Sequence, residues 1–544
     1  MVLWGDDMTD FYIRTEDISN DKLLELFVES ERDRQIVEAI KGPNPVVLVG
    51  SRGVGKSFLL KVANSELKNS FVENRVFPVY VSFTKSSLVQ FSQPQQFQFW
   101  MLAKLCNAIL RALGREGLLV QAPKQVSILA GQPVNNASNM TRLEAVEDAF
   151  ETSWKSQDQV IDVTGVPDID SFKDAIEDIC NQLKIKRITL FIDEAAHVFI
   201  PQQQRAFFTM FRDLRSSYIT CNAAIYPGVT SFGDTFQPAH DATFISIDRD
   251  ILDNGYVQNM REIVEKQADS ETQKAITRNG QLFAILAYAA SGNPRLLLKT
   301  ILKAKKLSSS EVNDVFRTFY RSEIWGEHSV LAEKYPGHKH LIDWGRNFIE
   351  SVLLPEIQKK NIMSLESEKS TSSFFWLHRD APIGVKHALQ ILSYTGIVSE
   401  HSLGVKATRA EIGTRYSVNL GCLFSLETNP AQTAFGIAKA LSIKRMTEFG
   451  ANNNSYADLQ QNQANLEDGT ANRQALVAQL DKSINVLDIT DWQKTKMREL
   501  ELTTVGDVLK ATEGDLKKAN YVGDVRARQM RNAAEAAVFE YLSG

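Results

Sequence analysis

The chain has 544 residues, which is too long for one hydrophobic core, so we expect several domains. Apolar residues make up 43% of the chain and charged residues 23%, as in globular proteins rather than disordered chains. The formal net charge of −5 gives no bulk attraction to nucleic acid, so any contact with DNA requires a local basic surface.

The sequence contains no pattern of export or of membrane insertion. Its first ten residues, MVLWGDDMTD, are acidic and lack the apolar core of a signal peptide. No apolar run reaches the length of a membrane-spanning helix. The four cysteines lie far apart, which argues against a zinc site or a disulfide framework. We therefore predict a cytoplasmic protein without a membrane partner.

A glycine-rich loop, GSRGVGKS at residues 50–57, lies between a short apolar run and a helical pattern. Its spacing is that of a P-loop, in which backbone N–H groups and a helix N-terminus surround phosphate. Lys56 is expected to reach the β- and γ-phosphates, and the Ser57 hydroxyl to ligate Mg²⁺. The predicted nucleotide-binding residues here are Gly50, Ser51, Arg52, Gly53, Val54, Gly55, Lys56, Ser57 and Phe58.

A second motif follows the apolar run 187–192, which leads directly into Asp193 and Glu194. Downstream of a P-loop this pattern predicts a neighbouring parallel strand, with Asp193 holding Mg²⁺ and Glu194 polarising the attacking water. Further strands are predicted over 76–83, 220–229 and 243–247, with helices between them, so the sheet is parallel. A polar residue at the end of the 220–229 strand would sense the γ-phosphate. Thr230 is the first candidate and Asn222 the second.

A helical region spans 250–306 and contains the sequence GNPR at 292–295. Asn293 and Pro294 predict a turn followed by a helix, which places Arg295 on the first helical turn. In an ATPase with a helical lid, an arginine at this position reaches back to the phosphates. The alternative is an exposed arginine in a salt bridge.

Four stretches in this order, FVESERD at 27–33, GSRGVGKS, TLFIDEA at 189–195 and GNPR, resemble AAA+ ATPases of the origin-recognition and initiator branch, related to the STAND group. The resemblance covers about residues 25–306. It implies ATP and Mg²⁺ as cofactors and a homo-oligomer as the assembly. It carries over Lys56, Glu194 and Arg295 as catalytic residues, and Ser57 and Asp193 as metal-binding residues.

One departure concerns the arginine finger, which family members usually carry before the last strand of the sheet. The corresponding stretch here, 231–241, contains no arginine. Two explanations remain open at this point. Either Arg212 or Arg215 acts on a neighbouring subunit, or hydrolysis is slow and the protein works as an ATP-bound switch.

The C-terminal half predicts two small modules. A helix near 381–392 followed by two strand patterns has the outline of a winged helix, in which Lys386 and Arg409 would face DNA. The last sixty residues resemble a helix-hairpin-helix module, in which Gly523, Arg526 and Arg528 would contact phosphates. Either module could instead bind protein.

The predicted fold class is an α/β P-loop ATPase, with a parallel sheet and a helical lid, followed by a winged-helix domain and a small all-α helix-hairpin-helix domain. The expected divisions are 1–25 lead-in, 26–248 nucleotide-binding core, 249–306 lid, 307–428 helical connector and winged helix, 429–484 flexible linker, and 485–544 helix-hairpin-helix domain.

Two functional hypotheses follow. The first is an AAA+ ATPase switch that couples nucleotide state to DNA binding and oligomeric assembly, in initiation, mobile-element or anti-phage defence biology. The second is a STAND-type signalling scaffold whose C-terminal modules recruit a protein effector.

Overall fold

The computed structural model describes residues 11–89, 94–119, 127–131, 141–153, 161–196, 199–229, 231–233, 235–408, 410–457, 459, 478, 480–487, 489–535 and 537. Within this part of the chain, no helix is both long enough and apolar enough to cross a membrane. Its four cysteines are buried free thiols.

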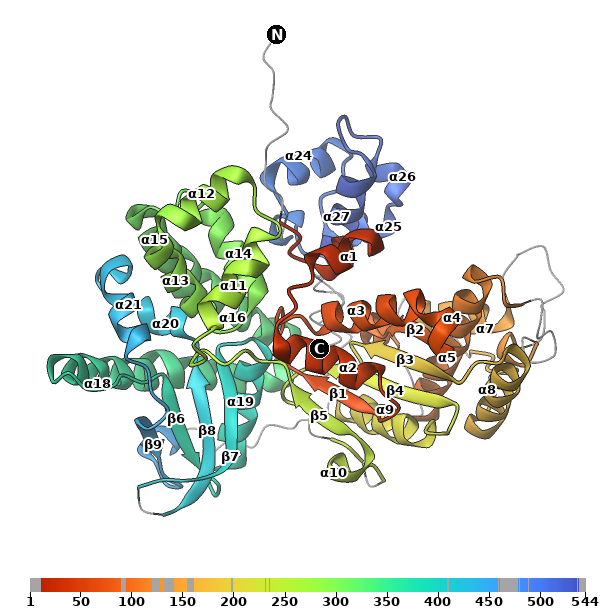
Figure 1. Ribbon diagram of the computed structural model, residues 1–544, viewed down its shortest axis with the longest axis horizontal. Helices are drawn as coiled ribbons and strands as arrows, with labels where there is room; N and C mark the ends of the chain where they lie inside the picture. Colours follow the sequence, from red (N-terminus) through yellow and green to blue (C-terminus); the bar gives the residue numbers. More distant parts are fainter. Residues whose placement is uncertain are drawn as a thin grey trace, which may run out of the picture.

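A five-stranded parallel sheet forms the core of the N-terminal half (Figure 1). Its order is β2-β3-β4-β1-β5, so the strand that leads into the P-loop lies between β4 and β5. The carboxyl ends of parallel strands meet at one edge, which brings together the residues that follow β1, β3 and β4. The strands are β1 (Val46–Val49), β2 (Val76–Ser82), β3 (Arg187–Asp193), β4 (Ile219–Ile225) and β5 (Thr243–Ser246).

Helices cover both faces of this sheet (Figure 1). On one face, α2 (Glu31–Lys41) and α3 (Lys56–Asn69) bury their apolar stripes against β1 and β4. Ser30 caps the N-terminus of α2, because its side chain accepts a hydrogen bond from the Asp33 amide. A second apolar core on the other face is built from α5 (Pro94–Arg115), α7 (Arg142–Thr152), α8 (Ile169–Leu183) and α9 (Pro201–Asp213).

The helical lid follows the sheet, and its helices pack directly against those of the connector. Both share one large apolar core, so the lid is supported from the side that faces the C-terminal half. The lid helices are α11 (Tyr256–Glu265), α12 (Ser270–Arg278), α13 (Gly280–Ala289) and α14 (Pro294–Lys303). The connector helices are α15 (Ser309–Val315), α16 (Ile324–Lys334), α17 (Lys339–Asn347) and α18 (Leu354–Glu366).

A mixed four-stranded sheet follows, in the order β7-β8-β6-β9. Helix α19 (Ile383–Tyr394) precedes the antiparallel hairpin of β7 (Val398–Lys406) and β8 (Ile412–Val418), which is the predicted helix-and-hairpin outline. Strand β6 (Phe374–His378) pairs antiparallel with β8. The hairpin is the part of this domain that extends farthest from the nucleotide-binding core in Figure 1.

The predicted flexible linker at 429–484 is wrong over its first twenty residues. Helix α21 (Pro430–Lys439) packs beside α13 and α15, and β9 (Met446–Phe449) pairs in parallel with β6. The helix contains several alanines, and small side chains such as Ala434 are fully buried. Its strand partner is distant in sequence, and local composition does not reveal such a pairing.

The C-terminal module contains α24 (Asp491–Glu499), α25 (Val505–Lys510), α26 (Glu513–Leu516) and α27 (Asp524–Glu535). Three of these helices begin with a capping box, at Thr490, Thr504 and Thr512. The module lies beside the N-terminal segment rather than at a distance from the core (Figure 1). Its Asn532 side chain donates a hydrogen bond to Asp17 at 2.8 Å.

The predicted lead-in is also folded. A single turn, η1 (Thr15–Asp17), and α1 (Asn20–Leu26) precede α2, and Phe11 and Leu23 are buried. Polar side chains dominate this segment in the sequence. It is nevertheless ordered by contacts with the lid and with α27, both of which lie hundreds of residues away.

Candidate nucleotide-binding site

The P-loop connects β1 to α3 in the conformation that the motif requires. Gly53 and Gly55 have φ values of 88° and 109°, a region that only glycine adopts readily. A Cβ on Gly53 would also lie 2.7 Å from Cβ of Arg295 on the lid. The loop is therefore closed against the lid, and both glycines are required by geometry as well as by phosphate binding.

Lys56 is buried at the start of α3 and lies at the centre of the site. Its Nζ donates to the carbonyl oxygens of Gly50 and Ser51, at 2.7 and 3.0 Å, and lies 3.8 Å from the centroid of the Tyr226 ring. Burial lowers the pKa of Lys56 to about 8, although the nearby carboxylates of Glu194, Asp193 and Asp248 oppose this shift. A buried cation whose pKa has been lowered by desolvation fits an anionic ligand, such as the phosphates of a nucleotide.

Asp193 and Glu194 lie together at the end of β3, as predicted. The Tyr80 hydroxyl donates to one Asp193 carboxylate oxygen at 2.6 Å, and the Glu194 amide donates to the other at 3.0 Å. Glu194 has a φ of 53°, an uncommon value for a residue with a side chain. The Tyr226 hydroxyl donates to its Oε1 at 2.7 Å. The Glu194 carboxylate is thus held by both its backbone and a neighbouring hydroxyl.

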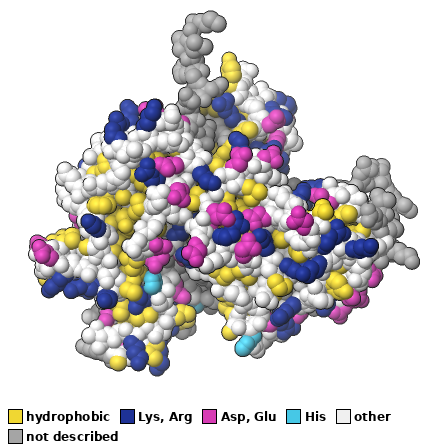
Figure 2. Space-filling model, viewed as in Figure 1, with side chains coloured by type: hydrophobic (Ala, Val, Ile, Leu, Met, Phe, Trp, Pro, Cys, Tyr) yellow, Lys and Arg dark blue, Asp and Glu magenta, His cyan; other side chains and the backbone are white. Residues whose placement is uncertain are grey.

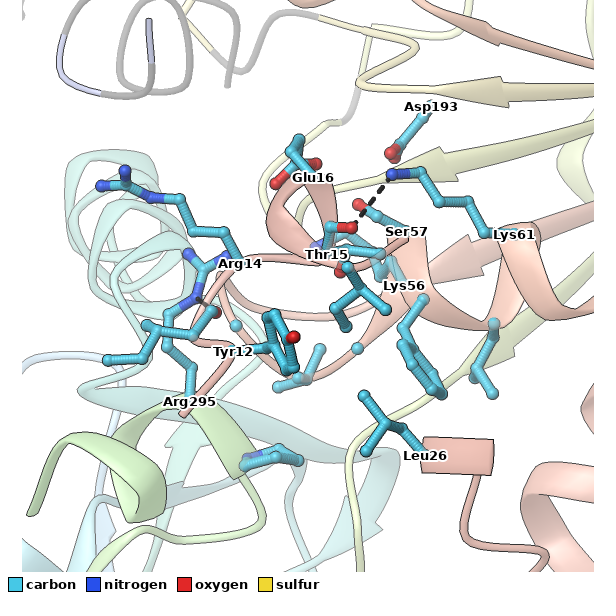
Figure 3. A pocket seen from close by; sticks show the side chains of 18 of the residues that line it. Tyr12, Arg14, Thr15, Glu16, Leu26, Lys56, Ser57, Lys61, Asp193 and Arg295 are labelled. Carbon is cyan, nitrogen blue, oxygen red and sulfur yellow. Dashed lines mark hydrogen bonds between the residues drawn. The ribbon is translucent and has the colours of Figure 1, made fainter. Parts of the chain in front are cut away.

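The Ser57 hydroxyl and the Asp193 carboxylate are among the oxygen donors that line this cavity, and both are labelled in Figure 3. Among the described residues, no group of three or more His, Cys, Asp or Glu side chains could hold a metal ion alone. This donor set fits Mg²⁺, which takes few protein ligands and completes its coordination with phosphate oxygens and water.

The lid contacts the P-loop through Asn293, Arg295 and Arg249. The Asn293 side chain donates to the Arg52 carbonyl oxygen at 2.7 Å and caps α14 by accepting from the Leu296 amide. Arg295 lies on the first turn of α14, as predicted, and its Nε donates to the Ile13 carbonyl oxygen at 3.2 Å. Arg249 pairs with Asp33 at 3.0 Å and donates to the Val54 carbonyl oxygen at 3.1 Å.

These residues surround a cavity of about 440 Å³ (Figure 3). Its lining includes the apolar residues Leu26, Phe27 and Val28 and the acidic residues Asp193 and Glu194, and Leu26 and Asp193 lie on opposite sides of the view in Figure 3. The N-terminal segment forms part of the wall, and Lys61 of α3 donates to the Thr15 carbonyl oxygen at 3.2 Å. The cavity has the apolar and cationic surfaces that a nucleoside and its phosphates require.

The structure does not support Asn222 as a γ-phosphate sensor. Its side-chain oxygen accepts from the Val46 amide and its nitrogen donates to the Ile40 carbonyl oxygen, at the opposite end of β1 from the P-loop. Thr230 lies outside the described residues. Tyr226, directly after β4, contacts both Lys56 and Glu194. Sequence reasoning missed Tyr226 because a tyrosine at a strand end has no distinctive pattern.

The two alternative finger arginines lie on or just after α9. The Arg212 guanidinium bonds to Asp213 and to the Thr235 carbonyl oxygen, whereas Arg215 is exposed. Neither lines the cavity within this chain.

The residues predicted to contact DNA differ in their exposure and in their hydrogen bonds. Lys386 donates to the Arg379 carbonyl oxygen, and Arg409 lies outside the described residues. Gly523 precedes α27, and a Cβ at this position would meet no other atom within 4 Å. In the turn before α27, Tyr521 has a positive φ of 67°. Arg528 is exposed, and the exposed Arg526 donates to the Tyr521 carbonyl oxygen at 2.9 Å. On the face shown in Figure 2, basic and acidic side chains are interspersed.

The parallel sheet, the P-loop and the helical lid together define a P-loop nucleotide-binding protein of the α/β class. Within that class, the chain belongs to the ORC-CDC6-like family, whose model matches residues 11–371, more than half of the chain. The match extends beyond the expected 25–306 at both ends, and it includes the folded N-terminal segment.

Two solved structures from Aeropyrum pernix show a weak likeness. The ORC1 protein in complex with DNA is 14% identical, with a TM-score of 0.26, over 79% of this chain and 95% of that chain. The ORC2 protein, in ADPNP–ADP complexes, is 10% identical, with a TM-score of 0.32, over 76% of this chain and 94% of that chain. At such low TM-scores we draw no conclusion from either structure. A comparison with curated proteins gives no match.

Proposed function

We propose that the protein is an ATPase that uses ATP and Mg²⁺ and couples its nucleotide state to DNA binding and to the assembly of a homo-oligomer. Family membership and the cavity support the nucleotide part of this proposal. In it, Lys56 and Arg295 bind the phosphates, Ser57 and Asp193 hold the cation, and Glu194 accepts a proton from the attacking water.

One set of contacts supports the coupling between the nucleotide site and the hairpin domain. The Tyr226 hydroxyl bonds to Glu194, and the Tyr226 ring lies edge-on to the Tyr394 ring, with 5.1 Å between centroids. Tyr394 is the last residue of α19, the helix before the β-hairpin. Gly396, two residues after Tyr394, lies close to the P-loop, since a Cβ on Gly396 would lie 3.4 Å from the Ser51 hydroxyl. A change in Lys56 or Glu194 on nucleotide binding therefore reaches the hairpin domain through two packed contacts.

The test measures ATP turnover and particle mass with and without duplex DNA, over a series of salt concentrations. We expect DNA to change the rate or the assembly, and DNA affinity to fall as salt rises. Glu194→Gln should lower turnover about 100-fold or more while nucleotide binding persists. If DNA alters neither rate nor mass and binds without a salt dependence, the DNA-coupled function is wrong.

The coupling has its own test in Tyr226→Phe, which keeps the ring and removes the bond to Glu194. We expect slower turnover and a weaker response to DNA, with nucleotide affinity retained. Tyr218→Phe is the matched control, because that hydroxyl bonds to Asn181 at the other end of β4. Equal behaviour of the two variants would show that the bond to Glu194 carries no signal.

A second function is favoured by the charge pairs of the C-terminal module. Lys517 pairs with Asp524 and Lys518 with Asp515, both at 2.7 Å, which reduces the positive charge offered to phosphate. The alternative is thus a STAND-type scaffold whose module binds a protein effector. Deleting residues 485–544 should weaken salt-dependent DNA binding under the first function. Under the second function the undeleted chain shows no such binding for the deletion to weaken.

A further inference from the structure

Residues 12–16 and 18 of the N-terminal segment line the nucleotide cavity and form one of its walls. In Figure 3, Thr15 and Glu16 lie beside Ser57, near the end of the cavity where we place the phosphates and the cation. Lys61 of α3 donates to the Thr15 carbonyl oxygen at 3.2 Å. The P-loop helix therefore holds this wall from one side.

The lid holds the same wall from a second side. Arg295 donates to the Ile13 carbonyl oxygen at 3.2 Å, and the Tyr12 amide donates to the side-chain oxygen of Gln267 at 2.9 Å. Because these bonds use backbone groups of the N-terminal segment, they fix its path along the cavity.

The C-terminal module supplies a third contact to this wall. Helix α27 packs against η1, and the Asn532 side chain donates to the Asp17 carboxylate at 2.8 Å. Asn532 also lines the nucleotide cavity, and among the described residues it is the only lining residue beyond the lid. Its neighbours Ala533 and Ala534 are fully buried in the core that the module shares with the lid and the connector. Asn532 therefore projects from a well-anchored part of α27.

The Asp17 carboxylate connects the module to the cationic residues of the site. Burial raises the pKa of Asp17, whereas the bond from Asn532 and the nearby charges of Arg14, Arg295 and Lys61 oppose that shift. Arg14, Arg295 and Lys61 all line the nucleotide cavity. Loss of Asn532 would leave this partly buried carboxylate with one hydrogen bond fewer, and the wall that carries it would be held less firmly.

We propose that the C-terminal module completes the nucleotide site, with Asn532 as a positioning residue that holds the N-terminal wall closed over the nucleotide through Asp17. The proposal rests on the nucleotide-binding function proposed above, and it assigns to the module control over how fast nucleotide leaves. Release requires a wall of the cavity to move, and such movements often set the rate of release. By linkage, bound nucleotide must in turn hold α27 more firmly against η1.

The test follows the release of Mg-ADP that carries a fluorescent group on its ribose, from the full-length protein, by stopped-flow fluorescence. Asn532→Ala should release this nucleotide about fivefold faster, since one hydrogen bond that holds the wall is lost. Asn532→Asp should release it faster still, because two carboxylates then repel each other. Asn520→Ala, which replaces an exposed asparagine of the same module, is the matched control and should leave the rate unchanged.

An exchanged pair separates positioning from a general loss of structure. Asp17→Asn combined with Asn532→Asp restores one donor and one acceptor, so release should return close to the wild-type rate. Saturating Mg-ADP should also slow hydrogen exchange in α27 of the wild type, and Asn532→Ala should lose part of this protection.

Two kinds of failure can be told apart. If the wild type does not bind Mg-ADP, the nucleotide function itself is wrong, and this proposal falls with it. If the wild type binds Mg-ADP but Asn532→Ala and Asn532→Asp release it at the wild-type rate, only the role of the module is wrong. Absence of rescue in the exchanged pair, or α27 exchange that ignores Mg-ADP, would also overturn that role.

Discussion

The two C-terminal parts of the molecule are attached to the nucleotide site in different ways. The hairpin domain contacts it through buried rings, with Tyr394 against Tyr226 and Phe199. The C-terminal module contacts the N-terminal segment through the hydrogen bond of Asn532 to Asp17, and it also shares the large apolar core of the lid and the connector. Apolar contacts persist when salt or pH changes, whereas polar contacts exchange readily with water. The hairpin domain should therefore move with the nucleotide site, and the polar contact between Asn532 and Asp17 should open more readily than the aromatic contact.

The largest effect is expected for Tyr394→Ala, which removes the aromatic contact between the hairpin domain and the nucleotide site. Removing a fully buried ring leaves a cavity, so we expect the free energy of unfolding to fall by about 3–5 kcal/mol. Urea denaturation measures the loss. Tyr521→Ala is the matched control, since Tyr521 is 84% exposed, and its effect should stay within about 0.5 kcal/mol. A small loss for Tyr394→Ala would mean that the aromatic contact does not hold the domain in place.

The pH dependence of nucleotide affinity tests whether the buried Lys56, in the site that the hairpin domain contacts, binds phosphate. Bound phosphate favours the charged lysine, so the pKa must be higher in the complex than its value of about 8 in the free protein. Binding then takes up a proton above pH 8, and affinity should fall by up to about tenfold per pH unit.

Titrations of Mg-ADP between pH 7 and 10 check this expectation. Lys56→Arg, which stays charged throughout, should show weaker binding without that slope. A flat profile for the wild type would exclude Lys56 as a phosphate ligand.

The smallest effect is expected for Asn532→Ala, which removes the hydrogen bond to Asp17. The module should open more often, by about 1 kcal/mol, without unfolding the core. Hydrogen exchange of residues 491–535 reports the opening, while exchange in β3 and β4 serves as an internal reference. Asn520→Ala, which replaces an exposed asparagine of the same module, is the control. Faster exchange throughout the chain would mean that the module is part of the core.

The parts that sequence analysis predicted correctly are those defined by local spacing. The P-loop, the pair Asp193–Glu194, the parallel strands and the turn before Arg295 all lie where their motifs indicate. The parts it missed depend on partners distant in sequence. Tyr226 gains its position from the strand order, and Asp33 from an arginine 216 residues later. The folded N-terminal segment and the stretch 430–449 are polar or alanine-rich, and only tertiary contacts order them.

The contact between Asp17 and Asn532 spans 515 residues of chain. During synthesis, α27 leaves the ribosome hundreds of residues after the N-terminal segment. The sheet and lid can fold while the later modules are still being made, because domains generally fold as they emerge. The contact between Asp17 and Asn532, however, can form only after α27 has left the ribosome. The N-terminal segment is therefore without this contact while the sheet and lid fold.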